Sequence, residues 1–247
     1  MANARKNLIV ISCEHGGREV TGAFASLFSD RESLLDSHRG WDPGALELGL
    51  QMANRLGVPL YAATTTRLLI DLNRSIGHRQ LFSEVSRRLS PALRQEIIDQ
   101  YYRPHRDAVE GAIARHISAG HRVLHIASHS FTPVLDGVKR QADVAWLYDP
   151  RRPSEVTFTA TWMKDIAQRA PELRLRGNYP YRGWGDGLTN LLRQRYPDEA
   201  YVGIELEVNQ SFVTRGGPPW DDLRAKLVDS LEQAQQDFPH ATGSSNS

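Results

Sequence analysis

Residues 8–17 read Leu-Ile-Val-Ile-Ser-Cys-Glu-His-Gly-Gly, an apolar run of strand length followed at once by charged and small residues. Successive residues at 8–12 are mostly apolar, so both faces of this strand are expected to be buried, as in a sheet covered by helices on each side. Five other segments read as strands, at 59–64, 122–128, 142–148, 173–176 and 201–208. The chain is therefore expected to contain a sheet of six largely buried strands.

Helical patterns separate these strands. Three of them have clear start and stop signals and are expected over residues 43–57, 91–120 and 218–237. Asp42 followed by Pro43 is typical of an N-cap and a first helical residue. Pro104 is expected to interrupt the second helix, because proline removes a backbone donor. The alternation predicts an α/β fold, with a mostly parallel mixed sheet and helices on both faces.

Neither an internal repeat nor a linker-like stretch divides the 247 residues. One domain is therefore expected over residues 1–239, and the small, polar residues 240–247 are expected to be a disordered tail. The 30 basic and 29 acidic residues are interspersed and give a net charge of +1, so neither nucleic acid nor a membrane is expected as a partner. The chain also lacks a run of about 20 apolar residues that could span a bilayer.

Cys13 is the only cysteine, which excludes an internal disulfide and suits a reducing cytoplasm. Its position near His15 raises the alternative of a cysteine nucleophile, although nothing else in the pattern requires one. A cytoplasmic location is expected, and the oligomeric state is left open.

Ligands of such sheets gather beyond the carboxyl ends of the strands. His15 follows the first strand and His129 ends the third, whereas His125 lies inside the third strand and is expected to be a core histidine. Two imidazoles and one carboxylate, with a position left for water, are a common catalytic zinc arrangement. Position alone leaves the third ligand open among Glu14, Asp36, His38 and Asp42.

Glu205 and Glu207 are two residues apart on the last strand, so they point to the same face. One of them is expected to be the general base that takes a proton from a metal-bound water. The other is expected to orient an arginine.

The segment after the second strand holds Arg67, Asp71, Asn73 and Arg74. Arginine binds carboxylates in two-point fashion, so the pair of arginines suggests a carboxylate-bearing substrate. An internal salt bridge with Asp71 is the structural alternative. Residues 178–187 form a glycine- and aromatic-rich loop, which is either a lid or wall of the pocket or an ordinary packed surface loop.

Together these motifs resemble the N-formylglutamate amidohydrolase family. The resemblance runs in order through nearly the whole chain, at residues 12–17, 38–45, 66–74, 129, 143, 178–183 and 205–209. It implies a zinc-dependent protein with the phosphorylase/hydrolase-like fold of the zinc carboxypeptidases and aspartoacylases. In that fold an arginine and an Asn-Arg pair hold the substrate carboxylate, and a late strand carries the catalytic glutamate.

The resemblance also implies roles for particular residues. His15 and His129 become metal ligands, and Glu207 becomes the base because it directly precedes the Val-Asn element. Arg67 is expected to stabilise the oxyanion. Substrate binding is expected at three further residues, Asn73, Arg74 and Tyr181.

Two departures from the pattern bear on these roles. The carboxypeptidase-like His-x-x-Glu pair is absent, because Arg18 stands three residues after His15. Asp42 is therefore favoured as the acidic ligand, with Glu14 as the close alternative. The first motif also differs from the Pro-His-Ser-Gly form associated with formylglutamate hydrolases, which bears on the identity of the substrate.

The expected function is zinc-dependent hydrolysis of a linear amide, such as a formyl- or acyl-amino acid, by a metal-activated water. A zinc carboxypeptidase-like peptidase or aminoacylase is the alternative enzyme. A binding protein that kept the fold and the arginine pocket but lost catalysis is the alternative outside enzymes. The acyl group, the amino acid and the pathway are left open.

Overall fold

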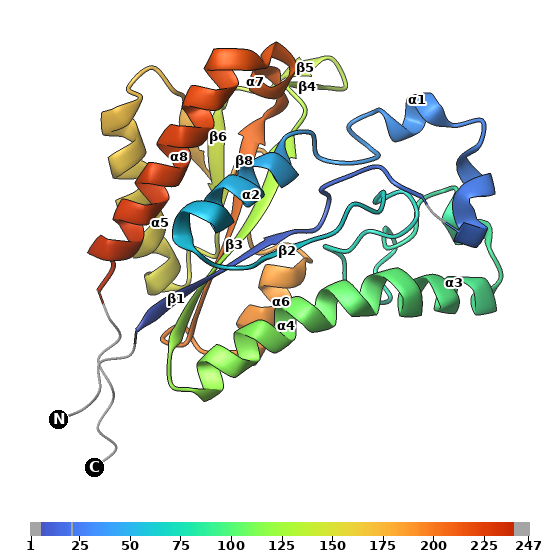
Figure 1. Cartoon of the computed structure of the whole chain (residues 1–247), viewed down its shortest axis with the longest axis horizontal. Helices are drawn as coiled ribbons and strands as arrows, with labels where there is room; N and C mark the ends of the chain where they lie inside the picture. Colours follow the sequence, from blue (N-terminus) through green and yellow to red (C-terminus); the bar gives the residue numbers. More distant parts are fainter. Residues whose placement is uncertain (1–5, 21, 240–247) are drawn as a thin grey trace.

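The computed structural model describes residues 6–20 and 22–239, and its central element is a six-stranded sheet in the order β2-β1-β3-β8-β6-β7 (Figure 1). The strands are β1 (Asn7–Cys13), β2 (Leu60–Ala62), β3 (Arg122–Phe131), β6 (Val144–Leu147), β7 (Leu175–Gly177) and β8 (Tyr201–Asn209). Each of the six expected strands is present. The residues expected to form a disordered tail, 240–247, lie outside the described part of the chain.

The sheet is mixed, as expected from the sequence. β2, β1, β3 and β8 run parallel to one another, whereas β6 is antiparallel to β8 and parallel to β7. A small hairpin of β4 (Val134–Leu135) and β5 (Val138–Lys139) lies between β3 and β6, and the sequence analysis did not anticipate it.

Helices cover both faces of the sheet, because alternate strand residues are apolar on opposite sides. Ile9, Ile11 and Leu124 pack against α2 (Ala45–Leu56), α5 (Pro153–Arg169) and α8 (Gly217–Asp237) on one face. Val10 and Val123 pack against α4 (Arg103–Ser118) and α6 (Leu188–Arg195) on the other. The remaining helical segments are η1 (Gly22–Phe28), α1 (Glu32–Leu35), η2 (Ser86–Arg88), α3 (Pro91–Ile97), η3 (Ile98–Tyr102) and α7 (Gln210–Arg215).

The start of one expected helix is wrong, and the interruption expected in another is present. Gly44 is the N-cap residue of α2, with φ of 80°, so the helix begins at Ala45 and Asp42 is not its cap. The Asp42 side chain is turned toward two histidines instead. The expected interruption at Pro104 is present as a π-helical turn, η3, which separates α3 from α4 and ends directly before Arg103 and Pro104.

A second apolar cluster lies beside the sheet, in the part of the molecule that holds η1, α1 and α3 (Figure 1). It includes Phe24, Phe28, Leu69, Ile70 and Ile97. This cluster, called the side lobe here, supports the segment of residues 67–74. No helix in the described residues combines the length and the apolar composition needed to cross a membrane.

Candidate active site

Three adjacent parallel strands bring the candidate site residues together. His15 lies two residues beyond the end of β1, and His129 lies near the end of β3. His129 is in register with Glu207 of β8. Because the strands end at the same edge of the sheet, residues far apart in sequence meet there.

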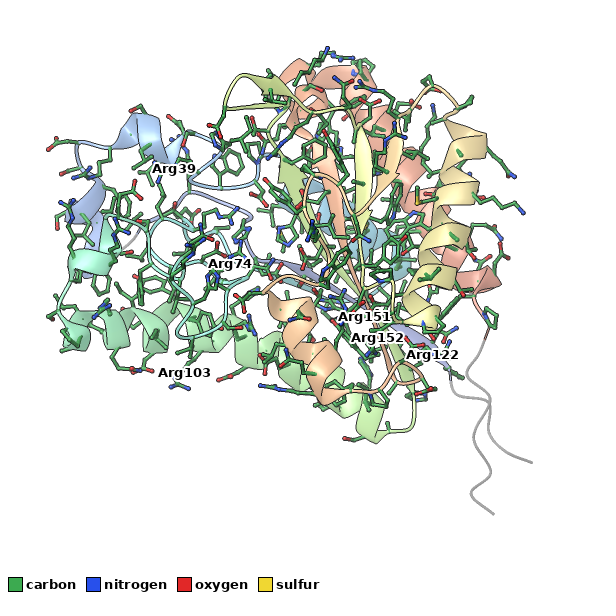
Figure 2. The ribbon with its side chains drawn as sticks, turned by 180° about the vertical axis from the view of Figure 1, so that it is seen from behind. Arg39, Arg74, Arg103, Arg122, Arg151 and Arg152 are labelled. Carbon is green, nitrogen blue, oxygen red and sulfur yellow. The ribbon has the colours of Figure 1, made fainter. Side chains whose placement is uncertain are left out.

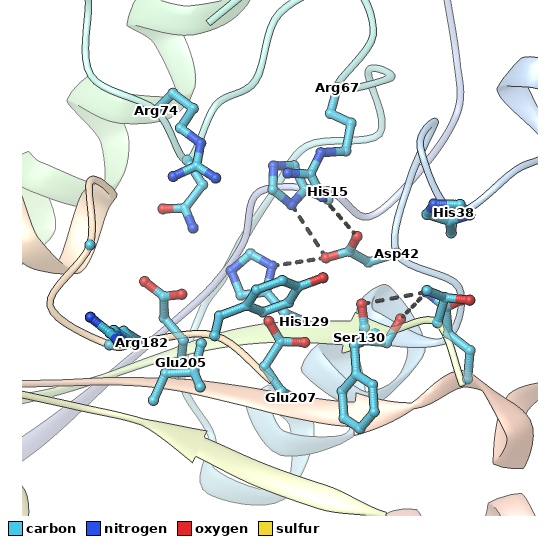
Figure 3. A pocket seen from close by; sticks show the side chains of 18 of the residues that line it. His15, His38, Asp42, Arg67, Arg74, His129, Ser130, Arg182, Glu205 and Glu207 are labelled. Carbon is cyan, nitrogen blue, oxygen red and sulfur yellow. Dashed lines mark hydrogen bonds and ion pairs between the residues drawn. The ribbon is translucent and has the colours of Figure 1, made fainter. Parts of the chain in front are cut away.

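His15, Asp42 and His129 form a buried group that could hold a metal ion. One potential ligand atom from each lies within 4.8 Å of the others. Asp42 Oδ2 is 3.3 Å from His15 Nδ1 and 2.9 Å from His129 Nδ1 (Figure 3). The two rings are tilted, with centroids 5.1 Å apart. Two imidazole nitrogens and a carboxylate oxygen are a donor set that suits zinc.

The outer nitrogen of each imidazole faces a second carboxylate. His15 Nε2 is 2.7 Å from Asp71 Oδ1, and His129 Nε2 is 3.1 Å from Glu14 Oε2. Carboxylates in this position orient metal-binding histidines and fix which ring nitrogen carries the proton. The arrangement leaves the two Nδ1 atoms directed toward the same point.

Backbone contacts hold these loops in place. Gly16 N donates to Ala63 O at 2.9 Å, and Asp42 N donates to His15 O at 2.9 Å. At Gly17 a Cβ atom would lie 2.6 Å from Thr64 O, so only glycine allows this close approach of the chains. The Gly-Gly pair after His15 therefore places the histidine against the neighbouring strand end.

The other candidates for a third ligand lie elsewhere. Glu14 is fully buried behind His129 and also faces His105, whose Nε2 is 3.5 Å from Glu14 Oε1. Asp36 is exposed and pairs with Arg18. His38 lines the same cavity as His15, but it is outside the group of potential ligands.

The charges around the two histidines favour a cation. Burial opposes protonation of His129, but the neighbouring carboxylates Asp42 and Glu14 outweigh it and hold the pKa of His129 well above its ordinary value. Burial also opposes ionisation of Asp42, yet His15, His129 and Arg67 together keep its pKa below the usual range. A buried cluster of carboxylates around two imidazoles fits the positive charge of a metal ion.

The group opens into a cavity of about 230 Å³, which Glu205 and Glu207 also line (Figure 3). Glu207 is buried, and its Oε2 has no hydrogen-bond partner among the described residues. The pKa of Glu207 is raised to about 8. Burial is the largest cause and the charges of Asp42 and Glu205 add to it, whereas the charge of His129 opposes it. Such a shift is typical of a carboxyl group in a functional cavity.

Arg67 forms the internal salt bridges that the sequence analysis gave as an alternative. Its Nη2 is 2.7 Å from Asp71 Oδ2, and its Nη1 is 3.3 Å from Asp42 Oδ1. The side chain also lines the cavity and is about one quarter exposed, at 27%. Both the salt-bridge interpretation and a cavity-facing position therefore hold for this residue.

The three expected substrate-binding residues all line the cavity, but with other contacts too. Arg74 Nη1 donates to Asp186 O at 2.7 Å, and Figure 2 shows Arg74 in the middle of the molecule. Asn73 Oδ1 accepts from Leu188 N at 2.8 Å, so this side chain anchors the start of α6. Tyr181 is 46% exposed and lies under the guanidinium of Arg140, so residues 178–187 do form a pocket wall.

Cys13 is fully buried, and burial raises its pKa well above the usual range, with Glu14 adding to the effect. It does not line the cavity, so the cysteine-nucleophile interpretation gains no support. His125 is a core histidine as expected. Its Nε2 is 2.8 Å from Ser12 Oγ and its Nδ1 is 2.8 Å from Tyr201 Oη.

Sequence reasoning missed the histidine contacts of Asp71 and Glu14. Asp71 was considered only as a partner for Arg67, because its distance from His15 in space cannot be read from a separation of 56 residues. Thr189, which donates to Glu205 Oε1 at 2.7 Å, was also missed, since the helix that carries it was not expected.

Residues 8–214 match the family model of the N-formylglutamate amidohydrolases. The chain belongs to this family. In this N-formylglutamate amidohydrolase family member, most of the motifs that gave the resemblance contribute residues to the cavity lining, whereas Asp143 lies outside it and pairs with Arg174. A comparison with proteins of curated function finds no match.

Solved structures share this fold. A gene product of Agrobacterium tumefaciens is 24% identical with a TM-score of 0.78, over 92% of this chain and 90% of that chain. An N-formylglutamate amidohydrolase from Ralstonia eutropha is 20% identical with a TM-score of 0.69, over 94% of each chain. A metallo-carboxypeptidase from Pseudomonas aeruginosa is a more distant match, 16% identical with a TM-score of 0.41, over 95% of this chain and 57% of that chain. The first two confirm the mixed α/β fold.

Proposed function

We propose that the chain is a zinc-dependent amidohydrolase that removes a formyl or acyl group from the nitrogen of a small, carboxylate-bearing amino acid. One observation carries the proposal. Glu207, with an unpartnered carboxyl oxygen, lines the same cavity as the His15, Asp42 and His129 group. Membership of a family of amidohydrolases supports the same reaction class.

His15, Asp42 and His129 are assigned as the zinc ligands, with Asp71 and Glu14 orienting the two imidazoles. Bound there, zinc would supply Lewis-acid polarisation of the amide carbonyl and of a water molecule. With His15 Nε2–H donating to Asp71, the lone pair of Nδ1 is directed toward Asp42 Oδ2 and the shared site.

Glu207 is assigned as the general base. It accepts the proton of the attacking water and returns it to the amine nitrogen as the carbon–nitrogen bond breaks. Arg67, fixed by its two ion pairs, donates a remaining N–H to the developing oxyanion. Arg74, with Asn73 and Tyr181 beside it on the cavity wall, receives the substrate carboxylate.

Metal analysis of the purified protein tests the proposal. We expect one zinc per chain, and we expect His15→Ala and His129→Ala to lose both the metal and hydrolysis of an N-formyl amino acid. The matched control is His38→Ala, since His38 lines the same cavity outside the ligand group and its loss should leave the metal in place. Metal-free protein with activity that a chelator leaves unchanged would refute the assignment, and a zinc-loaded protein without hydrolysis would indicate a binding protein.

A further inference from the structure

Glu205 is a second carboxylate of the cavity wall that the proposed mechanism leaves unused. It lies two positions before Glu207 on β8, so the two side chains share a face and their Cα atoms are about 6.5–7 Å apart. Figure 3 shows both glutamates at the cavity, with Glu207 on the side of His129. A group of the substrate that reached Glu205 would therefore lie one side-chain length from the reacting carbonyl.

The carboxylate of Glu205 is held in one orientation. Thr189, which is buried in the first turn of α6, donates its hydroxyl to Oε1 at 2.7 Å. The backbone at Gly187 passes so close that a Cβ atom there would lie 3.4 Å from the same oxygen. Oε1 is thus committed to the protein, and a fixed rotamer makes the other oxygen a pre-organised acceptor.

The other oxygen, Oε2, is free for a ligand. Among the described residues no side chain or backbone group donates a hydrogen bond to it, and it is not a buried atom, so it is open to the cavity. The three arginines that line the cavity are engaged elsewhere: Arg67 pairs with Asp42 and Asp71, Arg74 donates to Asp186 O, and Arg182 lies over the ring of Trp184. Within the part of the chain that the structure describes, none of the three forms an ion pair with Glu205.

A fixed, unpaired carboxylate accepts hydrogen bonds from nitrogen donors and repels other carboxylates. We propose that Glu205 is a specificity-determining residue that accepts a hydrogen bond from a nitrogen donor in the substrate's side chain. The inference rests on the proposed function and narrows its substrate class. The substrates are N-acyl derivatives of amino acids with an amide or ammonium side chain, and an acidic side chain such as that of glutamate is disfavoured.

Isosteric substrates give the sharpest test. N-formyl-L-glutamine and N-formyl-L-glutamate differ only in the group that would meet Glu205, and N-formyl-L-lysine separates a charged donor from a neutral one. We expect kcat/KM of the zinc-loaded enzyme to favour glutamine over glutamate at least tenfold. Glu205→Gln should shrink or reverse this ratio. Thr189 can still donate to the amide oxygen, so the amide NH2 group, a donor, takes the place of the free acceptor Oε2. Equal or better hydrolysis of the glutamate compound by the wild-type enzyme, or an unchanged ratio in Glu205→Gln, would overturn the inference.

Two controls tie the effect to this carboxylate. Glu232→Gln makes the same substitution outside the cavity lining, where Glu232 pairs with Arg55, and it should leave the ratio unchanged. Thr189→Val keeps the shape of the side chain and removes the hydroxyl donor, so it should weaken the preference by freeing the rotamer of Glu205. A Thr189→Val ratio equal to that of the wild type would count against a pre-organised acceptor.

A binding measurement separates failure of this inference from failure of the proposed function. Titration calorimetry of the glutamine and glutamate compounds into Glu207→Gln protein reads the preference without turnover. If no compound is hydrolysed by the wild type but glutamine binds at least tenfold more tightly, the amidohydrolase proposal fails and the role of Glu205 stands. If binding is equal for the two, or undetectable for both, the role of Glu205 is refuted whatever the hydrolysis result.

Discussion

Individual residues of the site divide into those that face the cavity and those that hold others in place. His15 and His129 are both backed by carboxylates, Asp71 and Glu14, that the cavity does not reach. Arg67 does both, since it pairs with Asp42 and Asp71 and still lines the cavity. Substitution effects at this site should therefore separate metal retention from turnover.

Glu207→Gln is expected to keep the zinc and the fold and to lower kcat by about 10²–10⁴-fold, because the amide cannot take the proton from water. Glu205→Gln should retain far more turnover with N-formyl-L-glutamine as substrate. Steady-state kinetics with metal content measured on the same samples checks this. A larger loss in Glu205→Gln than in Glu207→Gln would show that the base is the other glutamate of β8.

Arg74→Ala is expected mainly to raise KM for an N-formyl amino acid, since a two-point contact with the substrate carboxylate is lost. Arg67→Ala should lower kcat more, because loss of an oxyanion donor costs roughly 10²–10³-fold. Kinetics with the free acid and with its carboxamide check the assignment of Arg74. Blocking the carboxylate should impair the wild type and barely change Arg74→Ala.

The control for that experiment is Arg103→Ala, which removes an exposed arginine of α4 outside the cavity lining. It should leave both parameters unchanged. A wild-type enzyme indifferent to blocking of the carboxylate would remove Arg74 from the substrate site and leave it a structural role through Asp186 O and Asp71.

The asparagines of the motifs show why residue roles are hard to read from sequence. Asn73 accepts from Leu188 N, Asn178 from Tyr148 N, and Asn209 from Ser211 N. Each anchors a backbone segment with its side-chain oxygen. A motif residue can be either an anchor of this kind or a catalytic group, because both roles require a fixed position in the fold.

At the scale of elements, the strands were predictable because burial on both faces leaves a strong apolar signal in sequence. The helices α2 and α8 were also predictable, because glycine and proline lie at their ends. α5 begins with Pro153 at a first helical position, a signal that was present and not used. α6 offered no such signal, because the residue that anchors its start, Asn73, lies 115 positions away.

His125, a fully buried histidine in the middle of β3, makes the stability of the sheet depend on pH. Burial lowers the pKa of His125 from an ordinary 6.5 to about 4. Between these values the unfolded chain binds a proton that the folded chain does not, so stability is full above pH 6.5 and falls as the pH drops toward 4. At 1.36 kcal/mol per pKa unit the full shift corresponds to a loss of about 3 kcal/mol.

Urea unfolding of the chelator-treated protein at several pH values measures this loss. His125→Gln is the matched variant, because glutamine can bond with Ser12 and Tyr201 but does not titrate. The wild type should lose about 2–3 kcal/mol more than this variant between pH 7 and 4. Parallel pH curves for the two proteins would place the acid sensitivity in other groups.

At the scale of the whole molecule, the proposed catalytic and substrate-binding groups are supported by two apolar cores. The sheet supplies His15, His129 and Glu207, whereas the side lobe supports Arg67 and Arg74. The sequence predicted the sheet edge as the place of the site. The side lobe was not predicted, because its residues follow neither a strand nor a long helical period and become a core only by packing on each other.

Zinc should stabilise the whole chain against heat if it binds the folded protein alone. At a free zinc concentration 100 times the Kd the gain is about 2.7 kcal/mol, which corresponds to a rise in Tm of about 5–10 °C for a domain of this size. Thermal scans with zinc and with a chelator measure it. His129→Ala should show no such difference, and an equal shift in that variant would place the zinc elsewhere.

The spacing of the three proposed ligand residues also sets an order of events in time. Asp42 lies 27 positions from His15 and 87 positions from His129, and the three meet only once β1 and β3 have paired. An unfolded chain offers no such preassembled site, so pairing of β1 with β3 must precede assembly of the complete ligand set. Under the proposed zinc assignment, completion of the metal site becomes a late step of the protein's maturation, and the supply of zinc controls how much of the folded protein becomes active.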